Sequence, residues 1–300
     1  MMMKRKLFAA AALMLTALCM GCPSATAQTV RPAGDGKYGL LSGKVSMTVD
    51  AAHGGKILSF KYGEKEVISQ TAFPNSFGST FWTSPQSEWN WPPVPEIDAE
   101  PYEVRISDDE LVLTGRKSER FGYRVRKSFS VDPADGAVIV TYSILNESGE
   151  TRQVAPWEIT RVPNDGLIFF DADRVEGSNR MEPLPFVFEK GAAWYAVDVA
   201  EKNRKTNADG KGWLAFSNDG LMLVKTFPDL DASQPAPAEA EIQIYVNAGK
   251  TYVEIEEQGA YTILAPGEQL DWTVRWYLMP QTLPSVPDEA LLEPVRKIIR

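Results

Sequence analysis

The chain has 300 residues, a formal net charge of −9 and a single histidine, His53. This acidity argues against nucleic acid and anionic membranes as partners, because binding to either needs clustered Lys and Arg. One histidine excludes a histidine-rich zinc site, and a Ser-His-Asp triad would depend on His53.

The first 27 residues have the features of a secretory signal peptide. Residues 4–6 are basic, and residues 7–20 form an apolar run that is too short and wrongly flanked for a membrane span. The motif Ala25-Thr26-Ala27 then predicts cleavage before Gln28 and export to the periplasm. The alternative is a lipoprotein attached at Cys22, behind a poor lipobox.

Loss of this segment changes the chain that folds. Both cysteines, Cys19 and Cys22, lie within it, so no disulfide and no cysteine nucleophile is expected. It also holds three basic residues and no acidic one, so its removal lowers the net charge from −9 to −12. We predict a single domain over residues 28–300 that depends on its hydrophobic core alone.

Short β-branched and aromatic runs, separated by turn residues, recur along the chain and predict strands. The predicted strands cover residues 44–49, 56–62, 65–68, 102–106, 110–114, 123–131, 137–145, 151–162, 167–170, 194–199, 213–216, 221–227, 241–246, 252–257 and 270–278.

Many strands without a strand–helix alternation predict an all-β fold, a large twisted antiparallel β-sandwich. Residues 288–299 (DEALLEPVRKII) allow one short C-terminal helix. Residues 172–185, 200–212 and 228–240 are predicted to be polar loops. The acidic residues 170–174 leave calcium open, but their spacing matches no known calcium loop, so we assign no metal ligand and no cofactor.

The segment GSTFWTSPQSEWNWPPVP, residues 78–95, holds three of the eight tryptophans and four prolines. Proline cannot donate a ladder hydrogen bond, so we expect a loop without regular secondary structure. Its aromatic side chains either plug one end of the sandwich or offer a sugar-stacking platform, and we expect one tryptophan buried and one facing a cleft. The candidate ligand contacts are Trp82, Gln86, Trp89 and Trp91.

Three further motifs occur in a recognisable order. They are GGKILSF at residues 54–60, YVEIEEQG at residues 252–259 and LAPGEQLDWTVRWYL at residues 264–278. Together they resemble the galactose mutarotase-like superfamily, which includes the aldose 1-epimerases. Residues 78–95 and VAPWEITRV at residues 154–162 resemble a bacterial branch of it that carries a domain of unknown function.

The resemblance implies a β-supersandwich with a sugar-sized cleft and assigns Glu256 as the general base. The superfamily's acid is a histidine, at a place where this chain has Trp157, Glu158 and Arg161. Trp157 and Arg161 are therefore candidate substrate contacts, as is Lys225 at a predicted strand end. Glu158 and Arg161 are three residues apart, so both can line one pocket only if the strand has a bulge.

Opening a sugar ring needs a base at the anomeric hydroxyl and an acid at the ring oxygen. A glutamate is ionised at neutral pH, so Glu256 suits the base. Glu158 can be the acid only if burial raises its pKa, and Lys225 or a tyrosine is the alternative. On pattern alone, Glu254, Glu256 and Glu257 fit a solvated strand face better than a cleft, and only the motif match supports a place for Glu256 in a cleft.

Three functions remain open at this point. The first is an exported protein that recognises a mono- or oligosaccharide and has weak or absent epimerase activity. The second is an active aldose 1-epimerase or related isomerase that uses Glu256. The third is a non-catalytic protein-interaction module docking through its aromatic loop. The oligomeric state and the identity of the sugar are left open.

Overall fold

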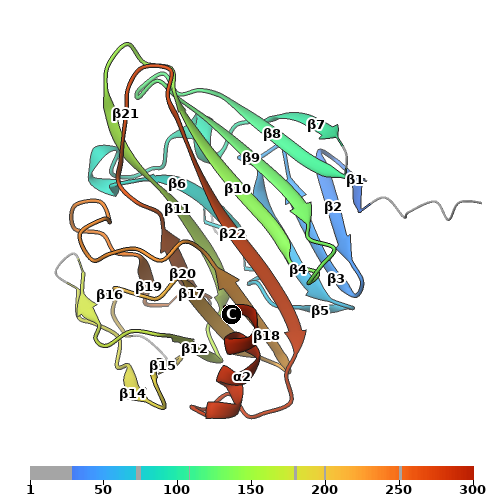
Figure 1. The fold of residues 1–300 in the computed structure, drawn as a ribbon, viewed down its shortest axis with the longest axis vertical. Helices are drawn as coiled ribbons and strands as arrows, with labels where there is room; N and C mark the ends of the chain where they lie inside the picture. The colour runs from blue at the N-terminus through green and yellow to red at the C-terminus, as the bar shows by residue number, and fades with distance from the viewer. Residues whose placement is uncertain (1–28, 72–75, 108, 179–180, 199–200, 250–251) are drawn as a thin grey trace, which may run out of the picture.

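The fold is taken from a computed structural model, which describes residues 29–71, 76–107, 109–178, 181–198, 201–249 and 252–300. The predicted signal peptide, its cleavage site and both cysteines lie outside these residues. The described chain forms two large antiparallel sheets, which confirms the all-β prediction (Figure 1). None of its helices is long and apolar enough to cross a membrane.

The first sheet has 12 strands among the described residues and carries the site discussed below. In spatial order its strands are β1 (Val30–Gly34), β2 (Lys37–Ser42), β3 (Val45–Asp50), β4 (Lys56–Tyr62), β6 (Ser79–Ser84), β11 (Arg152–Pro163), β20 (Tyr252–Gln258), β19 (Ile242–Val246), β16 (Arg204–Ala208) and β13 (Glu176–Gly177), with β5 (Lys65–Glu66) beside β4 and β21 (Thr262–Leu264) beside β11.

The second sheet has 10 strands among the described residues. In spatial order they are β14 (Val187–Glu189), β15 (Ala192–Ala196), β12 (Leu167–Phe170), β17 (Trp213–Asn218), β18 (Leu221–Thr226), β22 (Gln269–Pro280), β10 (Val138–Asn146), β9 (Tyr123–Val131), β8 (Glu110–Lys117) and β7 (Glu103–Ser107). In Figure 1 the long strands β9, β10 and β22 lie in front of β6, β11 and β20.

The helical elements are short. A 3₁₀ turn, η1 (Gln86–Glu88), and a one-turn helix, α1 (Pro95–Asp98), follow β6. The C-terminal helix α2 (Glu289–Ile298) lies where the sequence predicts it and contains a proline. Its N-terminus is capped by Asp288, whose side chain accepts a hydrogen bond from the Ala290 N–H at 2.9 Å.

The core lies between the two sheets, and side-chain alternation decides what enters it. Phe81 of β6 stacks on Tyr142 of β10 with ring centroids 4.4 Å apart. Its neighbour Trp82 points the other way and contacts Trp157, on the outer face of the first sheet. Each central strand of this sheet therefore sends one set of side chains into the core and the other set to the site.

Three predicted loops contain strands, which corrects the expectation from sequence. The shortest of these strands is β13 (Glu176–Gly177), within the predicted loop of residues 172–185. Ser79–Ser84 is β6, a wholly buried strand, although residues 78–95 were expected to lack regular structure. Arg204–Ala208 is β16, within the predicted loop of residues 200–212. The first proline of the aromatic segment is Pro85, directly after β6, so it ends the strand without preventing it.

Candidate functional site

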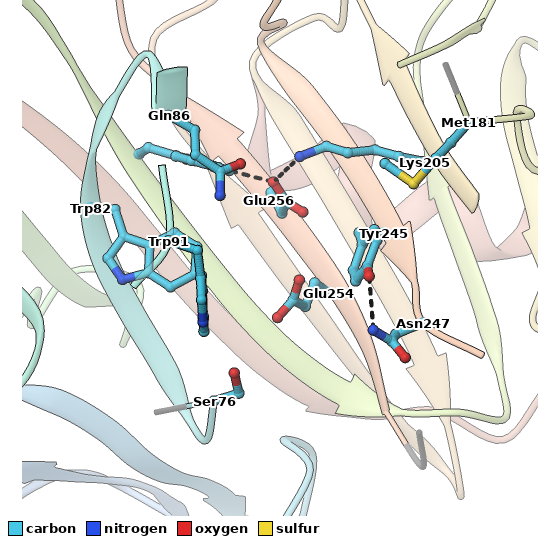
Figure 2. Close-up of a pocket in the computed structure, with 11 residues that line it drawn as sticks. Ser76, Trp82, Gln86, Trp91, Met181, Lys205, Tyr245, Asn247, Glu254 and Glu256 are labelled. Carbon is cyan, nitrogen blue, oxygen red and sulfur yellow. Dashed lines mark hydrogen bonds and ion pairs between the residues drawn. The ribbon is translucent and has the colours of Figure 1, made fainter. Parts of the chain in front are cut away.

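A cavity of about 330 Å³ opens on the outer face of the first sheet, the face turned away from the second sheet. It is lined by Ser76, Trp82, Gln86, Trp91, Trp157, Met181, Lys205, Tyr245, Asn247, Glu254 and Glu256. In Figure 2 the indoles of Trp82 and Trp91 stand on one side. Lys205, Tyr245 and Asn247 face them, and the two glutamates of β20 lie between.

Glu256 is the most constrained acid of this cavity. Its Oε2 accepts hydrogen bonds from the Trp157 indole N–H at 3.0 Å and from Lys205 Nζ at 3.1 Å. The side chain is about 2% exposed, and this burial raises the pKa of Glu256 to about 7, against the lowering effect of Lys205. A glutamate with this pKa exchanges its proton near neutral pH, as a general base must.

Glu254 lies two residues earlier on β20 and faces the same cavity. Arg161 Nη2 forms an ion pair with its Oε1 at 2.8 Å, and the Arg161 side chain is fully buried. The guanidinium lies over the rings of Trp82 and Tyr252, 6.0 and 5.6 Å from their centroids. Arg161 therefore sits behind the cavity wall and holds Glu254 in place, outside the set of lining residues.

The aromatic wall is held by hydrogen bonds to its indole nitrogens. Asp98 Oδ1 accepts from Trp82 Nε1 at 2.8 Å, and the Thr83 carbonyl accepts from Trp89 Nε1 at 2.8 Å. Trp89 is about 4% exposed and packs edge-on against Trp82, whereas Trp91 is 55% exposed and lines the cavity. The expectation of one buried and one cleft-facing tryptophan in this segment is confirmed.

Glu158 and Lys225 lie on the opposite side of the sheet, in the core. Lys225 Nζ forms ion pairs with the carboxylates of Glu158 and Glu257 and hydrogen-bonds Thr160 Oγ1 at 2.8 Å. All of these side chains are fully buried between the sheets. Strand β11 pairs with β20 in continuous register, so Glu158 and Arg161 point to opposite faces and no bulge unites them.

With this geometry in place, comparison with solved structures identifies the architecture. A protein of Escherichia coli K12, provisionally assigned as an aldose 1-epimerase, superposes with a TM-score of 0.62 at 16% identity, over 81% of this chain and 99% of that one. A galactose mutarotase-like protein of Lactobacillus casei gives 0.59 at 13% identity, over 81% and 100%. The chain has the galactose mutarotase-like fold.

A third solved structure agrees with this assignment, and the sequence comparisons find no match. A galactose mutarotase related enzyme of Lactobacillus acidophilus gives a TM-score of 0.56 at 12% identity, covering 84% of this chain and 100% of that one. No protein-family model matches the chain, and no curated protein matches it in sequence. At these identities the likeness establishes the mutarotase-like fold and assigns no role to any residue.

The mutarotase-like fold brings five sequence-predicted residues together and separates four others. Trp82, Gln86, Trp91, Trp157 and Glu256 line the cavity. Arg161 and Trp89 support its wall from behind, while Glu158 and Lys225 lie in the core.

Sequence reasoning missed the polar wall opposite the tryptophans. Lys205 belongs to β16, whose sequence RKTNA has no apolar alternation to predict a strand. Tyr245 and Asn247 come from β19 and its end, and Asn247 Nδ2 donates to the Tyr245 hydroxyl at 2.8 Å. Glu254 was recognised as a strand carboxylate, but its pattern favoured a solvated strand face.

The acidic residues 170–174 show no metal site. Among the described residues there is no group of three or more His, Cys, Asp or Glu side chains placed to hold an ion. Phe170 belongs to the buried strand β12, and the pKa of Asp171 is raised, chiefly because the carboxyl is partly desolvated.

Proposed function

We propose that the chain is a carbohydrate-binding protein, exported through residues 1–27, whose ligand lies in the cavity over Glu256. The observation that carries this proposal is the division of the cavity into an indole side and a polar side with a carboxylate floor. A pyranose ring has an apolar face of C–H groups and a rim of hydroxyls. The apolar C–H face suits stacking on Trp82 and Trp91, and the hydroxyls suit hydrogen bonds to Glu254, Glu256 and Lys205.

The size and rigidity of the cavity support a small ligand. A volume of about 330 Å³ is within the range of small-molecule pockets, which begins near 300 Å³. The indoles of Trp82 and Trp157 are fixed by Asp98 and Glu256, so these two side chains lose little freedom when a ligand binds. Ligand binding therefore requires little reorganisation of this wall.

A second candidate function is aldose 1-epimerase activity, and the Lys205–Glu256 pair favours it. The Glu256 carboxylate would remove the proton from the anomeric hydroxyl, and the cation on the same floor would stabilise the charge that develops as the ring opens. The bond between C1 and the ring oxygen breaks as Lys205 gives a proton to that oxygen. After C1 rotates, the ring oxygen attacks the opposite face of the aldehyde and returns its proton to Lys205, while Glu256 returns the first proton to the former carbonyl oxygen, which gives the other anomer. Lys205 would then supply the positive, proton-donating group in a site without histidine.

Proton NMR on residues 28–300 with freshly dissolved aldoses tests both functions. We expect saturation transfer from the protein to a hexose, pentose or uronic acid, and a roughly tenfold weaker affinity in Glu256→Gln, because hydrogen bonds to a charged acceptor are the stronger ones. Anomer exchange that is accelerated by the wild type and lost in Glu256→Gln would establish the epimerase.

The matched control is Glu64→Gln, in the exposed turn between β4 and β5. It carries the same change of charge far from the cavity and is expected to behave as the wild type in both measurements. No saturation transfer to any sugar of the panel would contradict carbohydrate binding and favour a protein-interaction module.

A further inference from the structure

A second cavity of about 380 Å³ adjoins the first. It is lined by Gln86, Ser87, Asn90 and Trp91 on one side and by residues 237–239 on the other. Gln86 and Trp91 also line the cavity over Glu256. The two cavities are therefore neighbours that share the exposed indole of Trp91 and the residue Gln86.

Trp91 forms the partition between the cavities. It is 55% exposed, although it meets Trp82 edge-on at 6.0 Å. The turn that carries it is fixed, since the N–H groups of Trp89 and Asn90 donate to the Gln86 carbonyl at 3.1 and 2.8 Å. A large indole held in this way, with more than half of its surface in water, is suited to stack a ligand.

The opposite wall belongs to the segment between β18 and β19, and hydrogen bonds on both sides hold it in place. Glu239 Oε1 accepts from the Gln86 backbone N–H at 3.2 Å, and its Oε2 accepts from Gln243 Nε2 at 2.8 Å. Further back, Glu241 accepts from the backbone N–H groups of Gly212 and Leu230 at 2.9 and 3.1 Å. The second cavity is therefore preformed, with an amide at Asn90 and a carboxylate at Glu239 beside the indole.

We propose that this second cavity is a subsite for a second pyranose unit, so that the natural ligand is an oligosaccharide of at least two sugars. The proposal rests on carbohydrate binding in the first cavity and specifies its ligand class. One unit would lie over Glu256 and the next would pass Trp91 toward Asn90 and Glu239.

A third cavity lies on another side of Trp91, but its chemistry suits a sugar less well. It shares Trp91, but not Gln86, with the cavity over Glu256. Its charged rim is engaged in internal contacts: Arg116 pairs with Glu100 at 2.9 Å, and Arg120 donates to the Trp89 carbonyl at 3.2 Å. A sugar hydroxyl there would have to displace existing partners.

Calorimetric titrations of the wild type with glucose, galactose, maltose, cellobiose and lactose test the subsite. We expect at least one disaccharide to bind about tenfold more tightly than its reducing-end monosaccharide. Ser87→Trp fills only the second cavity and should abolish this gain while leaving monosaccharide affinity within about twofold. Asn90→Gly removes the amide at a residue with φ of 58°, where glycine is unstrained, and should reduce the gain in part.

Glu119→Trp is the control, because it adds the same indole to the third cavity at a side chain that is 85% exposed. It should leave the disaccharide gain intact. Equal affinities for mono- and disaccharides in the wild type would overturn the subsite while leaving carbohydrate binding established. Loss of the gain in Glu119→Trp, but not in Ser87→Trp, would also overturn it. If no sugar of any size binds, carbohydrate binding itself is refuted, and the subsite with it.

Discussion

Replacing Lys225 with methionine is expected to lower the free energy of unfolding by about 3–5 kcal/mol, because a buried ion pair that loses one partner leaves an uncompensated charge. Lys225 contacts Glu158 and Glu257 and lies over the Trp276 ring, 4.2 Å from its centroid. Methionine preserves the packing volume and removes only the cation. Urea unfolding, followed by circular dichroism and tryptophan fluorescence, measures the loss.

The cluster contains two acids and one cation, so one acid must be neutral for the charges to balance. Burial, together with the nearby charge of Glu158, raises the pKa of Glu257 well above its ordinary value. Lys225 Nζ contacts one carboxylate oxygen of Glu158, and the Tyr142 hydroxyl donates to the other. Glu158→Gln should therefore restore most of the stability lost in Lys225→Met, since the double variant buries no uncompensated charge.

Lys65→Met is the control, because Lys65 is 55% exposed and its ion pair with Asp219 is 3.6 Å long. Its effect should stay within about 0.5 kcal/mol. The Glu158→Gln/Lys225→Met protein should also bind sugar like the wild type, since both residues lie in the core. A folded double variant that has lost sugar binding would contradict the structural role and return both residues to the site.

Half of the strands in the sheet that carries the site were predictable: β3, β4, β5, β11, β19 and β20 fall on predicted runs, whereas β1, β2, β6, β13, β16 and β21 do not. The motif YVEIEEQG was predicted as a strand, and β20 spans Tyr252–Gln258. Alternation alone could not say whether Glu256 or Glu257 faces a ligand, since adjacent residues point to opposite faces. The resemblance to mutarotase-like proteins selected Glu256, and the structure puts it in the cavity while Glu257 joins the core.

Two of the missed strands, β6 and β16, have a common physical origin in long-range partners. The polar strand β16 is stable because Lys205 pairs with Glu256, 51 residues away, and Thr206 accepts from the Leu184 N–H at 2.7 Å. The polar side chains of β6 are likewise satisfied at a distance, as Thr80 donates to Asp98 at 2.6 Å. Such partners make a polar segment stable as a buried strand, and they cannot be predicted from the local sequence pattern.

We expect the free energy of unfolding of the wild type, measured relative to that of Glu256→Gln, to fall by about 3 kcal/mol as the pH rises from 4.5 to 8. Each unit of pKa difference between the folded and unfolded states corresponds to about 1.4 kcal/mol. In the unfolded chain this carboxyl loses its proton near its ordinary pKa of 4.5, whereas in the folded protein it keeps the proton up to about 7. Between these values the folded state binds more protons, so raising the pH withdraws that stabilisation. Above pH 7 the loss is complete.

Comparing the wild type with Glu256→Gln separates the contribution of Glu256 from those of other carboxyls with a raised pKa. One of these is Glu241, whose burial also raises its pKa to about 7. Urea unfolding at half-unit pH steps gives the difference, and Glu64→Gln should show no such trend. If anomer exchange is accelerated, its rate should rise over the same interval, since only the ionised carboxyl can accept the hydroxyl proton. A stability difference that is flat with pH would mean that Glu256 ionises near 4.5, and the cavity would then hold a permanent Lys205–Glu256 ion pair suited to binding sugar hydroxyls.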